Sequence, residues 1–248
     1  GAPEAMEQRR ARELDARLGP KASVNPRCDL ILDLHSTTAN TGILLCVHPR
    51  DEFALQLAAH LSSLDDDVRV ALWPDLEDVP LLPTVARSGL TIEVGPCAHS
   101  TVSSELLHRT KRVIADAIAY IELHNKCVCA SPPAPARVVD LPVYARSYTL
   151  DYPSADGEVT AYIHPALQGV LELREPVKPT DLVFQTLGGR DLTLQEVMAE
   201  TSTEVQAPAA DDPELYPMFV NEAAYYEKGI AFMLAQKILK TVRVWTSS

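Results

Sequence analysis

Short apolar runs and longer stretches of helical periodicity alternate along the first 128 residues of the chain. Apolar runs of this length, bounded by turn residues, are typical of buried strands. We expect four such strands, at Cys28–Leu34, Gly42–Val47, Val68–Trp73 and Leu90–Val94. A high content of Glu, Arg, Ala and Leu predicts a helix over residues 4–18. Apolar residues at helical spacing predict two more, over Asp51–Leu64 with Asp51 as its cap, and from Ser103 or Ser104 to Ile121. This mixture indicates an α/β layer domain.

A proline-rich segment, Ser131–Pro135, interrupts this pattern and is interpreted as a linker. It divides the chain into an α/β domain over residues 1–128 and a smaller β-rich domain over residues 129–248. Short strands are predicted beyond it at Val159–Ile163, Leu182–Leu187 and Leu192–Leu194, with turns at Asp156-Gly157 and Gly188-Gly189. Periodicity predicts a last helix over Ala231–Leu239, and Gln206–Asp212 is predicted to be a surface loop.

Composition excludes several classes of function. The chain has 248 residues and a net charge of −12, which argues against nucleic acid as a partner because phosphate binding needs clustered Lys and Arg. No apolar run is long enough for a transmembrane helix, and the first residues are not a signal peptide. Five cysteines, an odd number, do not form a disulfide framework, and reduced thiols fit a cytoplasmic protein. Cys127 and Cys129 could bind a metal, but only His124 is close in sequence.

The first candidate site is His35, which ends an apolar run and is followed by three hydroxyl residues. In α/β sheets, ligands bind beyond the carboxyl ends of strands. Imidazole is a common zinc ligand, and Asp33 could orient it through a hydrogen bond. The alternative is a hydrogen-bonded histidine at a capped strand end.

Glu93 is the second candidate, because a lone carboxylate inside an apolar strand is costly unless it is paired or functional. Burial would raise its pKa towards the range of a general base. Alternatively, Glu93 reaches water at Gly95-Pro96. Arg87, six residues earlier, suits carboxylate recognition, although most lone arginines are surface residues.

Two further segments contain candidate residues. Tyr225 and Tyr226 lie among charged residues in the string Asn-Glu-Ala-Ala-Tyr-Tyr-Glu-Lys, residues 221–228, and could donate hydrogen bonds to an anion. They could equally pack at a domain contact. His164, in His-Pro-Ala-Leu-Gln, is a weaker candidate whose alternative is a histidine in a turn.

Together these motifs resemble those of aspartoacylases and aminoacylase III. Asp-Leu-His-Ser-Thr-Thr (33–38), Ile-Glu-Val-Gly-Pro (92–96), His-Pro-Ala-Leu-Gln (164–168) and the tyrosine string occur in the order of that family. The resemblance implies a zinc-carboxypeptidase-like domain with a mixed sheet, followed by a smaller β-rich domain. It implies zinc-dependent hydrolysis of small N-acyl amino acids, with His35 as a zinc ligand and Glu93 as the general base. Arg87 and Tyr225 would hold the substrate carboxylate, with Asp33, His164 and Glu222 in supporting roles.

The chain also departs from the family pattern. The family's other zinc ligands lie in an upstream Gly-x-His-Gly-Asn-Glu motif, and no His-x-x-Glu pair occurs here. A catalytic zinc needs about three protein ligands. We therefore expect a catalytic domain shortened at its N-terminus, with zinc binding absent or weak and activity absent or very weak. The alternative is a catalytically inactive homologue that acts as a protein-interaction module, with an apolar patch where further strands would pack. Homo-oligomers are common among such enzymes.

Substrate preference is predicted from smaller differences. Aspartoacylases have a tyrosine where this chain has Pro83, and Cys-Ala-His-Ser (97–100) replaces their Gln-Pro-Gln-Gly. These changes favour acetylated aromatic or S-conjugated amino acids, as in aminoacylase III, over N-acetylaspartate.

Overall fold

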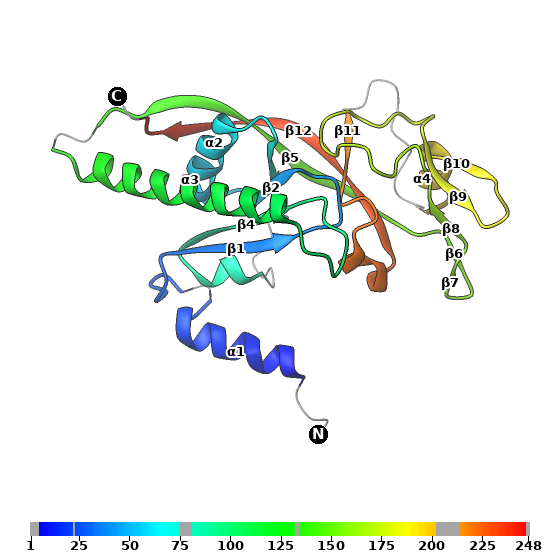
Figure 1. Cartoon of the computed structure of the whole chain (residues 1–248), viewed down its shortest axis with the longest axis horizontal. Helices are drawn as coiled ribbons and strands as arrows, with labels where there is room; N and C mark the ends of the chain where they lie inside the picture. The colour runs from blue at the N-terminus through cyan, green and yellow to red at the C-terminus, as the bar shows by residue number, and fades with distance from the viewer. Residues whose placement is uncertain (1–4, 22, 75–80, 132–133, 202–213, 247–248) are drawn as a thin grey trace.

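The computed structural model describes residues 5–21, 23–74, 81–131, 134–201 and 214–246. Its centre is a seven-stranded sheet with the order β1-β4-β2-β3-β5-β12-β11 (Figure 1). The strands in that order are β1 Leu30–Ser36, β4 Ser88–Val94, β2 Ile43–Val47, β3 Val68–Leu72, β5 Arg137–Asp151, β12 Ile230–Val244 and β11 Leu215–Met218. Strand β4 is parallel to β1 and antiparallel to β2, so the predicted mixed α/β fold is confirmed.

Two helices, α2 (Glu52–Leu64) and α3 (Ser104–Cys129), pack against the first half of this sheet. Both begin where the sequence predicts, because Asp51 accepts a hydrogen bond from the Ala54 amide and Ser103 accepts one from Leu106. The apolar faces of the helices bury a cluster around Leu45, Leu57, Leu90, Ile92 and Tyr120. This core fixes the strands β1, β4 and β2, which carry the candidate residues.

The C-terminal half of the chain extends the same sheet. Strands β5 and β12 form a long antiparallel ribbon, and β5 also pairs with β3. The helix predicted over Ala231–Leu239 is wrong, since these residues belong to β12. Residues 231–235 are buried between β5 and β11, and a continuous apolar run cannot by itself distinguish a buried strand from a buried helix.

A smaller lobe surrounds a second core, with strands β8 (Ala161–Ile163), β9 (Leu182–Thr186) and β10 (Asp191–Thr193) and helix α4 (Leu194–Thr201). A two-stranded sheet, β6 (Ser154–Ala155) and β7 (Glu158–Val159), is attached to it. The predicted turns are confirmed by the positive φ angles of Asp156, Gly157 and Gly189. The loop expected at Gln206–Asp212 lies outside the described residues.

Helix α1 (Met6–Leu18) forms where predicted but buries none of its residues, and it lies apart from the sheet in Figure 1. Among the described residues, no helix combines the length and the apolar composition that crossing a bilayer requires.

Candidate active site

His35 and Glu93 face each other across neighbouring parallel strands. In the register of β1 and β4, His35 is the Cα partner of Glu93, and Asp33 is the partner of Thr91. Side chains at partner positions project from the same face of a sheet, as do residues two apart in one strand. His35 Nε2 lies 3.0 Å from Asp33 Oδ2, and half of the His35 side chain is exposed. The three polar groups therefore form one cluster that opens to solvent.

The surroundings of Glu93 raise the pKa of its carboxyl group. Burial raises the pKa of Glu93 to about 7; His35 opposes this shift, while Glu222 and Asp33 add to it. On its other side, β4 pairs with β2, where Cys46 is buried beside Thr91. Burial, and then the charge of Glu93, raise the pKa of the Cys46 thiol. At neutral pH, Glu93 is thus poised to accept or donate a proton.

The tyrosine string docks onto the loop that follows His35. Its short 3-10 helix, η2 (Ala223–Lys228), begins after Glu222, which accepts a hydrogen bond from the Ala224 amide at 3.2 Å. The other oxygen of Glu222 accepts from the Thr37 hydroxyl, the Thr38 amide (2.9 Å), the Thr38 hydroxyl (3.1 Å) and the Ala39 amide (3.3 Å). Glu222 therefore fixes η2 against the end of β1.

This docking places Tyr225 beside Glu93. Burial raises the pKa of Tyr225 to about 12; Cys46, Glu93 and Glu222 add to the shift, and Arg146 opposes it. The Tyr225 ring packs edge-on against Phe219, with centroids 5.6 Å apart, and Lys228 Nζ lies 5.4 Å from its centre. At neutral pH the phenol keeps its proton and can donate a hydrogen bond to an anion.

A second buried carboxyl group, Glu172, holds the same loop. Its Oε1 accepts from the amides of Asn40 (3.0 Å) and Val220 (3.2 Å), and its own amide donates to the Asn40 carbonyl. Its Oε2 is buried and has no partner within the described part of the chain. Burial raises the pKa of Glu172 to about 8; the backbone amides of Val220, Asn40 and Phe219 oppose this shift, and Glu222 adds to it.

Sequence reasoning missed Glu172, although the signal was present. It is a single carboxylate in the apolar run Val-Leu-Glu-Leu, the same kind of pattern that singles out Glu93. Arg146, on β5, was also missed. It is exposed and nothing in its neighbours along the chain distinguishes it, so only the fold brings it near Tyr225.

Arg87 and His164 are not brought into this cluster. Arg87 precedes β4, whereas Glu93 is near the end of that strand, which separates them by roughly 20 Å at about 3.3 Å per residue. Its Nε lies 3.6 Å from Asp29 on the exposed surface. His164 lies in the smaller lobe, where its Nδ1 accepts from the Ala166 amide and its Nε2 lies 3.4 Å from Asp191.

The residues present do not fit a zinc centre. Across the described residues, no group of three or more His, Cys, Asp or Glu side chains is arranged to hold a metal ion. His35 has Asp33 as its close partner, and Cys127 and Cys129 lie in the last turn of α3 without forming such a group. A tetrahedral catalytic site needs about three protein ligands. The cluster described here therefore supplies a base, an imidazole and a phenol, but no complete metal site.

Comparison with known proteins identifies the family. The succinylglutamate desuccinylase/aspartoacylase catalytic domain model matches residues 1–121, and the AstE/AspA barrel-sandwich hybrid domain model matches residues 139–237. A probable aspartoacylase from Trichodesmium erythraeum is 32% identical over 96% of this chain and 73% of its own length. The mouse N-acyl-aromatic-L-amino acid amidohydrolase (carboxylate-forming) is 32% identical over 95% of this chain and 68% of its own length.

Structural similarity leads to the same family. The crystal structure of murine aminoacylase 3 superposes with a TM-score of 0.82 at 30% identity, covering 98% of this chain and 73% of that one. The fold that carries β1, β4 and η2 is thus shared with a solved relative. The chain belongs to the aspartoacylase and aminoacylase 3 family of amidohydrolases.

Proposed function

We propose that the cluster of His35, Glu93 and Tyr225 is the active site of a hydrolase for N-acyl-L-amino acids. The observation that carries the proposal is the register of β1 and β4, which sets the imidazole of His35 beside the carboxyl of Glu93. Tyr225, docked through Glu222, adds a phenol donor on the same side.

In the proposed reaction, Glu93 takes a proton from the water that attacks the acyl carbonyl. The new C–O bond forms, the C–N bond breaks, and Glu93 returns the proton to the departing amine. Its pKa of about 7 suits both steps near neutral pH. Tyr225 would donate to the substrate carboxylate, and Arg146 would supply the opposite charge.

The incomplete metal site limits what this chain does alone. The family resemblance assigns His35 to zinc, but the described residues do not complete a ligand set. We therefore propose that this chain binds zinc weakly and has absent or very weak turnover. Zinc content of the pure protein and amine release from N-acetyl amino acids test this directly. Stoichiometric zinc with turnover would contradict the proposal.

A chimera tests the function itself. The segment with the Gly-x-His-Gly-Asn-Glu motif from the mouse relative would be joined ahead of α1, with Glu93→Gln as the matched control. We expect zinc binding and amine release in the chimera, and zinc binding without amine release in the control. A chimera that binds zinc but leaves N-acetyl amino acids intact would refute the proposed function.

Acetylated aromatic amino acids are the proposed substrates, ahead of N-acetylaspartate. Asp33 and Glu222 both raise the pKa of Glu93, so acidic groups gather at the site. They would repel the side-chain carboxylate of N-acetylaspartate. The edge-on pair of Phe219 and Tyr225 offers a surface for an aromatic ring. The chimera would be compared on N-acetyltyrosine and N-acetylaspartate. A higher kcat/KM for the aspartate substrate would overturn the preference.

A second candidate is a non-catalytic interaction module. It is favoured by the place of β1 at the edge of the sheet, where 47% of the Leu34 surface is exposed. An unpaired edge can receive a further strand. Zinc-loaded but inactive chimeras would favour this function over hydrolysis.

A further inference from the structure

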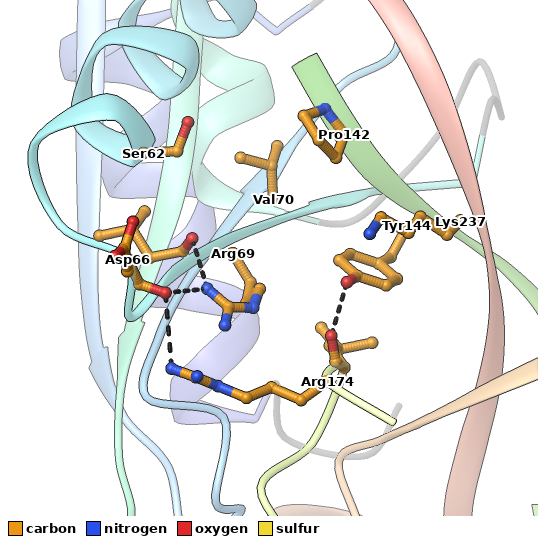
Figure 2. Close-up of a pocket in the computed structure, with 10 residues that line it drawn as sticks. Ser62, Asp66, Arg69, Val70, Pro142, Tyr144, Arg174 and Lys237 are labelled. Carbon is orange, nitrogen blue, oxygen red and sulfur yellow. Dashed lines mark hydrogen bonds between the residues drawn. The ribbon is translucent and has the colours of Figure 1, made fainter. Parts of the chain in front are cut away.

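A pocket with a positive lining lies in the gap between β3 and β5, away from the candidate active site. Its volume is about 400 Å³. Arg69, Arg174 and Lys237 line it, together with Ser62, Tyr144 and the single acidic residue Asp66 (Figure 2). The whole chain has 34 acidic and 22 basic residues, so this excess of cations is local and opposes the net charge.

The topology of the sheet creates this gap. Strands β3 and β5 pair at only two positions, Ala71 with Tyr144 and Leu72 with Ala145. Towards the start of β3 the strands diverge, because β5 continues in its ribbon with β12. Arg69 enters the gap from β3, Lys237 from β12, and Arg174 from the segment that follows Leu173 (Figure 2). Two of the three cations are therefore placed by strands of the sheet, and Arg174 is placed by a turn.

The charges of these cations are only partly compensated. Arg69 Nη1 donates to the carbonyls of Asp66 and Val68, neither of which carries charge. Arg174 Nη2 lies 3.2 Å from Asp67 Oδ1, but the same carboxylate also pairs with Arg109. Within the described part of the chain, Lys237 has no ion pair.

The two guanidinium groups also influence the buried tyrosine on β5. The Tyr144 hydroxyl donates to the Leu173 carbonyl at 2.5 Å, which holds the Arg174 segment against β5. Burial raises the pKa of Tyr144, and Arg69 and Arg174 oppose that shift, as expected for cations that face its hydroxyl. Arg69 and Arg174 also both donate to the Asp66 carbonyl, which places their guanidinium groups close together in the pocket.

We propose that this pocket binds a small oxyanion with two negative charges, of the size of sulfate or phosphate. Guanidinium groups present planar pairs of N–H donors that match such oxygens, and an ammonium adds a point charge. The lining contains none of the residues of the candidate active site, so this is a second, separate site.

Inorganic sulfate tests the proposal, because its charge does not change near neutral pH. Binding would be measured by calorimetry on the purified chain, with sodium chloride balancing the ionic strength. We expect saturable binding at one site. Lys237→Gln should weaken it about fivefold and Arg69→Gln about tenfold or more, since each removes a charge from the pocket.

Lys126→Gln is the matched control, because it removes the same charge from an exposed position on α3. It should leave sulfate affinity unchanged. Lys237 is exposed, so its replacement tests the pocket even if Arg69→Gln fails to fold. Absence of saturable binding, or equal affinities in wild type and Lys237→Gln, would overturn the proposal.

Discussion

Glu222 and Glu172 both bury a carboxyl group between the loop at residues 37–40 and the segment around η2, but they do so in opposite ways. Glu222 accepts five hydrogen bonds with its two oxygens. Glu172 accepts bonds from Asn40 and Val220 on one oxygen only, and its other oxygen is buried without a partner in the described residues. One loop is thus held by a carboxyl group that is bonded through both oxygens and by a second one that is bonded through a single oxygen.

Glu172 shows how a shortage of hydrogen-bond donors favours the protonated form of a buried carboxyl group. Where several amides and hydroxyls converge, they replace the water that a carboxylate loses. Where they do not, burial favours the neutral form, and the pKa of Glu172 rises to about 8. The stability contribution of Glu172 should therefore respond to pH.

Replacing Glu222 should have the largest effect. Glu222→Ala leaves the buried Thr37 hydroxyl and the Thr38 amide without the acceptor that they share. We expect the free energy of unfolding to fall by about 3 to 5 kcal/mol, measured by urea denaturation. Glu227→Ala, an exposed glutamate in the same helix, is the control and should change stability by less than about 0.5 kcal/mol. Similar losses in both variants would refute the role of Glu222.

The contribution of Glu172 to stability should depend on pH. The folded-state pKa of Glu172 is raised from 4.5 to about 8, so the folded chain holds a proton that the unfolded chain releases. Its contribution is therefore full below pH 4.5 and is lost as the pH rises towards 8. A tenfold difference in proton affinity between the folded and unfolded chains corresponds to about 1.4 kcal/mol, which predicts a decline of a few kcal/mol.

Glu172→Gln should remove most of this decline, because an amide keeps an acceptor for Asn40 and Val220 and does not ionise. Urea denaturation at a series of pH values measures it. The remaining slope is expected from Glu93, whose pKa is also raised. A variant with the same pH profile as wild type would show that Glu172 is already ionised in the folded chain.

Tyr225→Phe tests whether the Tyr225 hydroxyl, which the Glu222 contact positions, binds the substrate. Phenylalanine keeps the ring packing against Phe219 but lacks the hydroxyl that we propose binds the substrate carboxylate. We expect roughly tenfold weaker binding of N-acetyltyrosine in calorimetry, about 1.4 kcal/mol, with little change in stability. Unchanged affinity would remove Tyr225 from the binding site.

Replacing either of two arginines should have the smallest effect on substrate binding. Comparing the two variants tests which arginine belongs to the site. Arg146→Gln should weaken N-acetyltyrosine binding a few-fold, since Arg146 lies near Tyr225. Arg87→Gln should leave it unchanged, because Arg87 lies beyond the opposite end of β4. Weaker binding in Arg87→Gln than in Arg146→Gln would reverse this assignment.

Much of the fold could be predicted from local patterns. Strand and helix positions in the first half follow from apolar runs and from caps at Asp51 and Ser103. The long strand β12 could not, because its run at residues 231–235 is buried on both sides and carries no alternation. The pairing of β5 with β3, which joins the two halves into one sheet, leaves no local signal.

Part of the candidate site could also be predicted from local sequence patterns. His35 and Glu93 are polar residues that interrupt apolar runs, whereas their register depends on a pairing between distant segments. The prediction for Arg87 could have been tested from the sequence alone. Arg87 directly precedes β4 and Glu93 is the last residue but one of that strand, which places the two side chains at opposite ends of it.

The pKa of Glu93 is the most direct test of the proposed site. It can be measured by carbon-13 NMR of the side-chain carboxyl across a pH titration, with Glu93→Gln to assign the signal. A base buried between His35, Asp33 and Glu222 should titrate near pH 7. Titration near 4.5, the ordinary value, would show a solvated carboxylate and contradict the account.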